Sequence, residues 1–478
     1  MPGRAEVGQA WARLALVQGF CRGFLPAQDL LQVHIRPSEA CVTFQRAPMP
    51  GSRCSGSVRI APVMSLGALF LPFAALADGG AAARVADSGH TAWVLVATAL
   101  VLLMTLPGLA LFYGGMVRRK NVLATMTQTI AIAAVVTLTW CAVGYSLAMR
   151  PGTAFVGGLD RLFLDGLSLD ALSGGVPESV FAMFQLSFAI ITTALVPGAF
   201  AERMKFAAVL LFAALWSVLV YAPVAHWVWA PDGWLAVLGA LDYAGGTVVH
   251  INAGVAGLVC ALYVGPRSGY GRQPMTPYNL ALTLTGAALL WVGWFGFNAG
   301  SGLAADGRAG MAMLVTQLAA ATAAVAWMGT EWLVRGRPSA LGLVSGAVGG
   351  LVAVTPASGF ITPASALLIG AVAGVGCYLG ATVLKRLLRC DDALDAFGIH
   401  GVGGIIGALL TGWLASPAIG GVRGDTLAQL AGICATVVYS GGMTLIVLMA
   451  IDRLVGLRVG ERTESEGLDL SEHGEAIA

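Results

Sequence analysis

Long stretches without a charged residue set the strongest limit on what this chain can fold into. Residues 92–113, 123–149 and 180–200 contain no Asp, Glu, Lys or Arg, and each is close to or above the roughly 20 residues that a helix needs to cross a bilayer. Across the 478 residues, 57% are hydrophobic and 11% are charged, whereas soluble domains carry about 25% charged residues. The sequence therefore predicts an all-α polytopic membrane protein with the lipid bilayer as its main solvent.

We expect eleven transmembrane helices after residue 77. The predicted spans are residues 92–113, 123–147, 180–200, 206–224, 246–264, 279–298, 310–334, 341–356, 364–388, 397–414 and 427–452. The chain also contains 64 glycines, which suit helices that pack backbone to backbone in lipid.

The first 77 residues are expected to be absent from the mature protein. Arg59 precedes an apolar run over 63–76, and the run ends in Ala-Leu-Ala at 75–77. A basic flank, a short apolar core and a small-residue site predict a signal peptide over about 58–77. Met64 as the true start is the alternative. The chain then divides into a non-mature region (1–77), a membrane domain (78–455) and a C-terminal tail (456–478).

Lys and Arg residues are distributed unequally between the two sets of loops. One set holds the clusters at 118–120, 203–205, 267–272, 335–337, 385–389 and 453–462, whereas the opposite set holds only Arg150, Arg161, Arg308 and Arg423. Positive loops stay in the cytoplasm. We therefore expect a cytoplasmic-membrane protein with its mature N-terminus outside and its C-terminus in the cytoplasm.

The fifth and tenth predicted spans share a pattern that indicates an internal repeat. The fifth span has Asp242 before His250 and the tenth has Asp395 before His400, with glycines after each histidine. An odd number of spans per half makes the second half enter the membrane in the opposite direction. We therefore expect a five-plus-five inverted repeat, with a site between the halves near the midplane.

His250 and His400 are the only two of the six histidines within the predicted spans. A charged side chain in hydrocarbon costs at least ~2.5–3.5 kcal/mol, so it normally faces a partner or a pore. For one histidine, a hydrogen bond across a helix interface explains burial equally well; two at matched positions favour a pore. Neutral imidazole offers one donor and one acceptor, so two rings in contact can share a proton. Two histidines without a third ligand make a weak metal site, and no cofactor is expected.

Aromatic residues form a second group. Phe184, Gln185 and Phe188 lie at helical spacing in the third span, and Phe297 and Ser301 lie four apart at the end of the sixth. Aromatic faces can hold a small cation, worth about 0.5–2 kcal/mol, and a hydroxyl such as that of Ser301 adds an acceptor for an N–H group. The spacing alone does not separate such a site from ordinary packing.

Tryptophans and one acidic residue flank the fifth span on its outer side. Trp229 is predicted in the loop before this span, with Trp227 and Trp234 near it. An aromatic belt at the bilayer interface explains Trp227 and Trp234. Asp242 is expected to cap the helix by accepting from its backbone N–H groups, and its negative charge would help to recruit cations.

At this point the sequence resembles the ammonium transporters of the Amt/Mep/Rh superfamily, on the bacterial Amt branch. The matching strings are PGLALFYGG (107–115), KNVL (120–123), FAERMKF (200–206), DYAGGTVVHINAG (242–254), WFGFNAGS (294–301), VTPASG (354–359), DDALDAFGIHGVGG (391–404) and EGLDLSEHGE (466–475). They occur in family order from about residue 92 to the C-terminus.

The resemblance implies a role for each matching residue. His250 and His400 match the pore histidines, and Phe188 and Phe297 the stacked gate. Further matches are Trp229, Ser301 and Phe188 at the outer recruitment site, Asp242 as the acid that supports it, Phe112 and Tyr113 as an aromatic pair, and Phe184, Gln185 and Thr355 at vestibule or pore positions.

The resemblance also implies the fold, partners and activity. We expect the eleven-helix ammonium transporter fold, a homotrimer, a regulatory C-terminal tail and a PII-type signal protein on the cytoplasmic face. NH4+ would be recruited outside, and nitrogen would pass through an apolar pore; whether the proton follows stays open. An ammonium sensor that signals through a PII-type partner is the alternative. An enzyme is not expected, because no nucleophile–base pair or nucleotide loop occurs near the spans, and nothing points to nucleic acid.

One departure from the family pattern lies in the third span. Family members often read ITPALIVGA where this chain reads ITTALVPGA (191–199), which moves the proline to Pro197. Proline kinks a helix at its own position, so we expect the kink there and an intact gate at Phe188, which lies upstream.

Overall fold

A computed structural model describes residues 85–477 of the chain. The predicted signal peptide over 58–77, its cleavage site and Met64 lie outside the described residues, so the division of the chain at residue 77 stays a prediction.

Eleven apolar helical segments run through the described part of the chain, in the order the sequence predicts. Ten are long and apolar enough to span a membrane, and the eleventh, Ala340–Val354, is shorter. The ten are Ser88–Met116, Arg119–Met149, Glu178–Phe200, Phe206–Leu238, Gly246–Val264, Leu280–Gly300, Gly307–Arg335, Pro363–Leu387, Phe397–Leu414 and Thr426–Val455. The predicted all-α membrane fold is confirmed. The fourth segment continues well past residue 224, where we expected it to end.

Most segments consist of several consecutive helices. The α-helices are α2 (Ser88–Leu103), α3 (Ala110–Met116), α4 (Val122–Thr139), α5 (Tyr145–Met149), α6 (Glu178–Leu195), α7 (Pro197–Phe200), α8 (Phe206–Trp216), α9 (Ala222–Trp229), α10 (Trp234–Leu238), α11 (Asn252–Val264), α12 (Leu280–Gly300), α13 (Gly307–Arg335), α14 (Ala340–Val354), α15 (Pro363–Leu379), α16 (Lys385–Leu387), α17 (Val402–Leu414), α18 (Pro417–Gly420), α19 (Thr426–Val455), α20 (Glu461–Glu466) and α21 (Leu468–His473).

Turns of wider π-helix or tighter 3-10 helix join several of these helices. The π-helical turns are η1 (Met104–Leu109), η3 (Trp140–Gly144), η5 (Ser217–Tyr221), η6 (Gly246–Ile251), η7 (Gly380–Leu384) and η8 (Phe397–Gly401), and the 3-10 turns are η2 (Arg119–Asn121) and η4 (Leu162–Leu164). A short hairpin pairs β1 (Leu172–Ser173) with β2 (Val176–Pro177), Leu172 opposite Pro177.

Polar side chains fix where several spans begin. A helix leaves its first backbone N–H groups without an internal partner, and a preceding Asp, Asn, Ser or Thr side chain can accept from them. The helices α2, α12, α13, α14, α15 and α19 begin in this way after Asp87, Asn279, Asp306, Ser339, Thr362 and Asp425.

The third span breaks where its proline predicts. Helix α6 ends at Leu195 and α7 begins at Pro197, because proline has no N–H for the preceding turn. The Tyr113 hydroxyl donates to the Leu195 carbonyl at 3.1 Å. A hydroxyl from another span therefore bonds a carbonyl beside the break.

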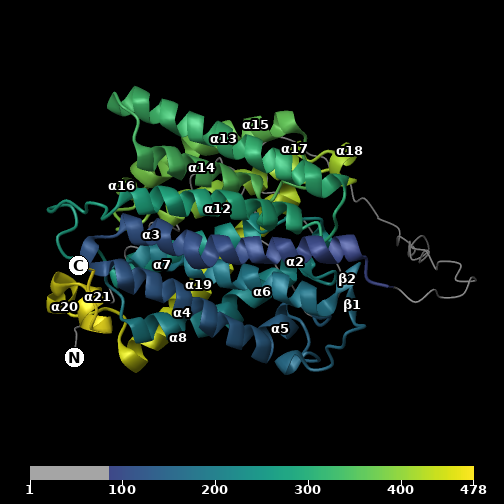
Figure 1. Cartoon of the computed structure of the whole chain (residues 1–478), viewed down its shortest axis with the longest axis horizontal. Helices are drawn as coiled ribbons and strands as arrows, with labels where there is room; N and C mark the ends of the chain where they lie inside the picture. The colour runs from purple at the N-terminus through teal and green to yellow at the C-terminus, as the bar shows by residue number, and fades with distance from the viewer. Residues whose placement is uncertain (1–84, 478) are drawn as a thin grey trace, which may run out of the picture. The chain divides into compact units, whose positions relative to one another are not determined.

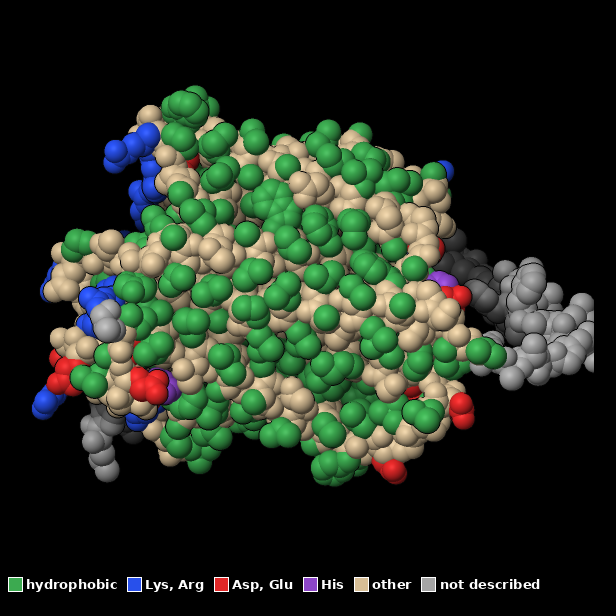
Figure 2. All heavy atoms as spheres, in the orientation of Figure 1, with side chains coloured by type: hydrophobic (Ala, Val, Ile, Leu, Met, Phe, Trp, Pro, Cys, Tyr) green, Lys and Arg blue, Asp and Glu red, His purple; other side chains and the backbone are tan. Residues whose placement is uncertain are grey.

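The long helices lie side by side, with α20 and α21 at the end opposite the β1–β2 hairpin (Figure 1). Helix α13 packs against α14 and α15, and α12 packs against α2. Hydrophobic side chains cover the broad middle of the visible face, and charged side chains gather toward its two ends (Figure 2). This distribution suits a bundle with lipid around its middle.

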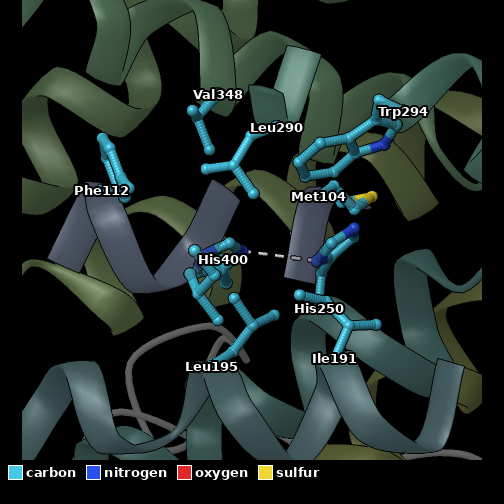
Figure 3. A pocket seen from close by; sticks show the side chains of 10 residues that line it. Met104, Phe112, Ile191, Leu195, His250, Leu290, Trp294, Val348 and His400 are labelled. Atoms are coloured by element: carbon cyan, nitrogen blue, oxygen red, sulfur yellow. Dashed lines mark hydrogen bonds between the residues drawn. The ribbon is translucent and has the colours of Figure 1, made fainter. Parts of the chain in front are cut away.

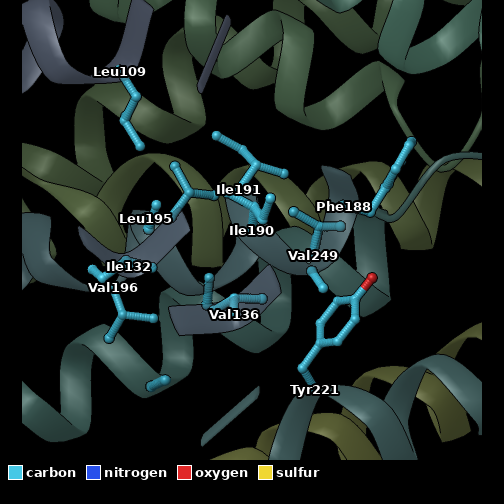
Figure 4. Close-up of a cluster of buried hydrophobic side chains, with 14 of the residues drawn as sticks. Leu109, Ile132, Val136, Phe188, Ile190, Ile191, Leu195, Val196, Tyr221 and Val249 are labelled. Carbon is cyan, nitrogen blue, oxygen red and sulfur yellow. The ribbon is translucent and has the colours of Figure 1, made fainter. Parts of the chain in front are cut away.

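Buried aliphatic side chains from several spans form the interior between the helices. Ile190, Ile191 and Leu195 of α6 lie beside Val249, and the Tyr221 ring reaches toward them from below (Figure 4). All five are almost fully buried. This apolar packing forms one wall of the region that holds the histidines.

The C-terminal tail returns to the bundle and bonds to the ends of the membrane helices. Asp469 accepts from the N–H groups of Leu123 and Ala124 at 3.1 and 2.8 Å, and the Leu468 N–H donates to Asn121 Oδ1 at 2.9 Å. The tail carboxylate thus accepts from the free N–H groups at the start of α4.

Candidate functional site

Two phenylalanines from different helices stack at one end of the candidate site. The rings of Phe188, on α6, and Phe297, on α12, lie 4.3 Å apart between centroids and 20° apart in plane. Both side chains are almost fully buried. Phe184, one helical turn before Phe188, meets that ring edge to face at 4.9 Å. The structure brings the predicted pair together as a stack of two rings from the two helices.

Trp229 packs against Phe188 of this stack. It is the last residue of α9 and not part of a loop, so its predicted placement was wrong: the apolar run continues as helix beyond residue 224. Its ring meets Phe188 at 5.7 Å and 85°, and its Nε1 donates to the Asp242 carbonyl at 3.0 Å. The indole face is thereby held against the stack.

Asp242 caps the start of the fifth span. Its two carboxylate oxygens accept from the backbone N–H groups of Gly245, Gly246, Thr247 and Val248 at 2.6–3.0 Å. Burial raises the pKa of this carboxyl, and the backbone hydrogen bonds oppose the rise. The side chain is fully used by its own helix, while its carbonyl holds Trp229.

Ser301 and Gln185 lie about one helical turn from the stacked phenylalanines, Ser301 after Phe297 and Gln185 before Phe188. The Ser301 hydroxyl donates to the Phe297 carbonyl at 2.8 Å, and its side chain is part exposed. This bond uses the hydroxyl proton and leaves oxygen lone pairs free to accept. Gln185 Oε1 is buried without a hydrogen-bond partner among the described residues.

Beyond the phenylalanines, His250 and His400 meet in the interior. Their Nδ1 atoms lie 3.4 Å apart, and the rings are 5.4 Å apart between centroids and 18° apart in plane. Both are almost fully buried. Two facing Nδ1 atoms form a hydrogen bond only when one carries a proton and the other does not. A bond between the two rings thus requires opposite protonation of the two Nδ1 atoms.

Glycine lets the two histidine-bearing helices cross closely. His250 lies in η6 and His400 in η8. A Cβ at Gly254 would collide with the backbone nitrogen of Gly401. The absence of a side chain at Gly254 therefore permits the contact between the rings.

Trp294 and Thr355 form a support on one side of His250. Trp294 stacks on the imidazole at 5.4 Å and 23°, and its Nε1 donates to Thr355 Oγ1 at 2.9 Å. The Thr355 hydroxyl in turn donates to the Leu351 carbonyl at 2.7 Å. Thr355 therefore contacts the histidines only through Trp294.

A narrow cavity lies between the histidines and their apolar neighbours (Figure 3). It is lined by Met104, Leu109, Phe112, Ile191, Leu195, His250, Leu290, Trp294, Val348 and His400. Apart from the two histidines, the lining residues are apolar or aromatic. Within residues 85–477, no group of three or more His, Cys, Asp or Glu side chains could hold a metal ion.

Phe112 and Tyr113 take different places. Phe112 lines the cavity, whereas the Tyr113 hydroxyl bonds to the Leu195 carbonyl. Their rings lie 5.9 Å apart. The predicted aromatic pair thus consists of a lining residue and a residue that holds the broken third span.

In the second half of the chain, the residue that corresponds to Asp242 is Asp392 and not Asp395, which the sequence pattern had indicated. Asp392, not Asp395, accepts from the N–H groups of Ala396 and Phe397, at 3.0 and 2.8 Å. Asp395 instead pairs with a lysine side chain. Asp392 precedes His400 at the same sequence distance as Asp242 precedes His250, a match that the nearer Asp395 concealed.

Sequence reasoning also missed a third buried histidine. His226 lies in α9, less than one turn before Trp229, and is fully buried. The prediction that only two histidines fall within spans was wrong, because we ended the fourth span at residue 224. The signal was present: the apolar run continues around His226 to Trp229.

Comparisons with known proteins agree with this architecture. The model of the Ammonium Transporter Family matches residues 92–477. An ammonium transporter of Aquifex aeolicus is 52% identical over 398 residues, which cover 81% of this chain and 93% of that protein.

Two solved structures share the fold. The crystal structure of Saccharomyces cerevisiae Mep2 matches with a TM-score of 0.73 at 37% identity, covering 78% of this chain and 88% of that one. A structure described as a sensor Amt protein matches with a TM-score of 0.76 at 30% identity, covering 80% and 98%. With the family model matched along its membrane domain and tail, this chain belongs to the Ammonium Transporter Family and is a multi-pass membrane protein that transports ammonium.

Proposed function

We propose that NH4+ binds on the outer side of the phenylalanine stack and that its nitrogen then passes along the two histidines. The observation that carries this proposal is the line of contacts from Trp229 to Phe188 and Phe297, and from Phe297 to His250 at 6.0 Å and on to His400. These residues come from separate spans and form one continuous series toward the cavity.

The outer group suits a small cation that carries N–H donors. The faces of Trp229 and Phe188 stabilise a bound cation by about 0.5–2 kcal/mol once the cation is partly desolvated. The Ser301 oxygen accepts a hydrogen bond that NH4+ can donate and K+ cannot. Asp242 contributes in two ways. Its carbonyl accepts from the indole N–H and so fixes Trp229, and the negative charge of its carboxylate helps to recruit the cation.

The interior suits ammonia better than the ammonium ion. A bare cation there would lose its hydration, and the desolvation penalty exceeds what aromatic faces return. We infer that the ion loses its proton at the gate of Phe188 and Phe297, either to water on the Trp229 side or to the imidazole pair of His250 and His400, and ammonium-evoked current distinguishes these two destinations. Ammonia then donates to, and accepts from, the imidazole nitrogens of His250 and His400. The buried Nε2 of His250, which lacks a hydrogen-bond partner in the described structure, supports this role.

We propose further that the end with Trp229 faces outward and that the C-terminus is cytoplasmic. The Lys- and Arg-rich loops at the other end support this orientation. The resemblance to the family supports a homotrimer and a PII-type partner on the cytoplasmic face. The tail over 456–478, which bonds to Leu123 and Ala124, is the element we assign to that regulation.

The test is ammonium transport by the full chain in proteoliposomes. Flux of nitrogen should fall when Trp229 is changed to Ala, chiefly through a raised KM. Ammonium-evoked current separates proton-coupled passage from neutral passage: nitrogen flux without current would show that the proton stays outside. Growth of a transport-deficient strain on low ammonium distinguishes a transporter from a pure sensor, since a sensor would not restore it.

A further inference from the structure

A set of hydrogen bonds on the Trp229 side joins two segments that lie far apart in the sequence. We call it the outer seam and define it by residues 148–156, which run on from the end of α5, and residues 226–234, which end α9 and lead into α10. Trp227 Nε1 donates across it to the Phe155 carbonyl at 2.7 Å. Two further bonds cross it: from the Gly152 N–H to Asp232 Oδ2 at 2.8 Å, and from the Trp234 N–H to the Ala154 carbonyl at 3.1 Å.

His226 lies within the outer seam with both ring nitrogens facing carbonyl oxygens. Nε2 is 2.8 Å from the Thr153 oxygen, and Nδ1 is 3.3 Å from the Ala148 oxygen. Carbonyl oxygens only accept, so the ring donates to at least one of them whichever nitrogen carries the proton. Asp232 Oδ1 lies 3.8 Å from Nε2. The side chain is fully buried, so it has no water to replace these partners.

One of these carbonyls has lost its usual helical partner. The carbonyl of Ala148, near the end of α5, would bond to the Gly152 N–H if the helix continued. That N–H donates to Asp232 instead. His226 is therefore the side chain that meets the Ala148 oxygen. Removal of the ring would leave a buried acceptor unsatisfied, at a cost of about 1–3 kcal/mol.

The outer seam holds the helical turn that carries Trp229. His226 and Trp229 belong to the same last turn of α9, and beyond Trp229 the chain turns away at residue 230. The indole has two other fixed contacts, the Asp242 carbonyl and the edge of Phe188. Its angle to the stack therefore depends on where the end of α9 lies, and His226 fixes that end against residues 148–156.

We propose that His226 is a positioning residue of the outer ammonium site, which holds Trp229 in place because its buried ring contacts the carbonyls of Ala148 and Thr153 and donates a hydrogen bond to at least one of them. The inference rests on the proposed role of Trp229 in binding. His226 itself does not contact the substrate and takes no part in the passage of nitrogen beyond the gate. A residue with that role changes the affinity for the ion and leaves the maximal rate near its normal value.

The experiment measures initial rates of methylammonium uptake by the full chain in proteoliposomes, with KM and Vmax determined separately. His226→Ala should raise KM about three- to tenfold, the ratio that corresponds to the loss of about one hydrogen bond, with Vmax within about twofold of the wild type. His226→Gln keeps an N–H donor and should show a smaller rise. The matched control is Ser146→Ala, which removes a bond of 2.8 Å to the Gly158 carbonyl outside the outer seam and should leave KM unchanged.

A double variant separates this inference from the function on which it rests. If His226 acts through Trp229, adding His226→Ala to Trp229→Ala raises KM no further. A full additional rise in the double variant, or a fall in Vmax at normal KM, overturns the positioning role. An unchanged KM in Trp229→Ala alone contradicts the outer site itself.

A variant of a neighbouring residue covers the case in which His226→Ala fails to insert in the membrane. Asp232→Asn keeps an oxygen for the Gly152 N–H but removes the charge beside the imidazole. It should raise KM by less than the loss of His226, and an unchanged KM for this variant would refute the proposal.

Discussion

The indole of Trp294 lies face to face with the imidazole of His250, 5.4 Å between centroids, while its N–H donates to Thr355 Oγ1 at 2.9 Å. The histidine pair thus has a support that is itself fixed by a hydrogen bond. Thr355 therefore fixes the ring on which His250 stacks.

Replacing Thr355 tests this support. Thr355→Val keeps the shape but removes the acceptor, so the buried indole N–H loses its partner at a cost of about 1–3 kcal/mol. We expect lower transport at normal protein levels in the membrane. Thr355→Ser keeps the oxygen and should retain most of the activity; loss in Thr355→Ser with activity retained in Thr355→Val would point to packing of the methyl group instead. Uptake rates normalised to reconstituted protein provide the measurement.

Removing one imidazole tests the pathway directly. His250→Ala eliminates the hydrogen-bonding groups of that ring from an otherwise apolar cavity and breaks the bond to His400. We expect ammonium transport to be lost, or its selectivity over K+ to be lost as the cavity widens. Flux and current should be measured with both ions. Wild-type flux together with wild-type selectivity would exclude a role for this ring.

Asp242 should matter for stability as well as for transport. An asparagine side chain has only one oxygen to accept hydrogen bonds from the four N–H groups that now donate to the carboxylate. We expect Asp242→Asn to lower the free energy of unfolding by about 1–3 kcal/mol, since at least one buried donor loses its partner. Thermal unfolding in detergent measures this, and Asp160→Asn, at an exposed site in an outer loop, is the control. An unchanged Tm would contradict the assigned cap.

We predict that the buried carboxyl of Asp392 makes the stability of the folded protein depend on pH. Burial raises the pKa of this carboxyl to about 6, from an ordinary value of 3.8, although the charge of Lys385 opposes the rise. The folded protein therefore holds the proton more tightly than the unfolded chain, so this group's contribution to stability falls as the pH rises between those two values and is constant above about 6.

The difference in Tm between Asp392→Asn and the wild type isolates that contribution. It should shift in favour of the asparagine variant as the pH is raised from about 4 to about 6 and then level off. A constant offset from the lost bond to the Phe397 N–H does not affect this trend. A difference that does not change over this range would show that the carboxyl keeps an ordinary pKa.

The sequence predicts most of the fold because lipid imposes simple rules. Uncharged runs of bilayer length predicted the spans, and the positions of Pro197 and the capping aspartates agree with local breaks and starts. The end of the fourth span was misplaced because α9 continues past residue 224, and this hid His226 and put Trp229 in a loop. Hydropathy marks the apolar middle of a helix better than an end that carries His and Trp side chains.

The motifs predicted which residues form the candidate site, but they did not predict its geometry. The strings around His250, His400 and Phe297 identify the residues, whereas the stacking angle of the phenylalanines depends on how α6 and α12 cross. Asp392 was missed for a related reason: Asp391, Asp392 and Asp395 are close in sequence, and only the backbone conformation decides which one accepts from the helix start. Gly254 had been noted for its position, but its contact with Gly401 required the packed structure.

The crossing at Gly254 has a consequence for how this protein can be damaged by mutation. Any side chain there would force apart the two backbones that carry the imidazoles. A genetic screen for lost ammonium uptake should therefore recover substitutions at this glycine, although it contributes no side chain that a passing molecule could bond to. Mutations can therefore disable the pathway at a glycine where two backbones cross, as well as at the rings that line the cavity.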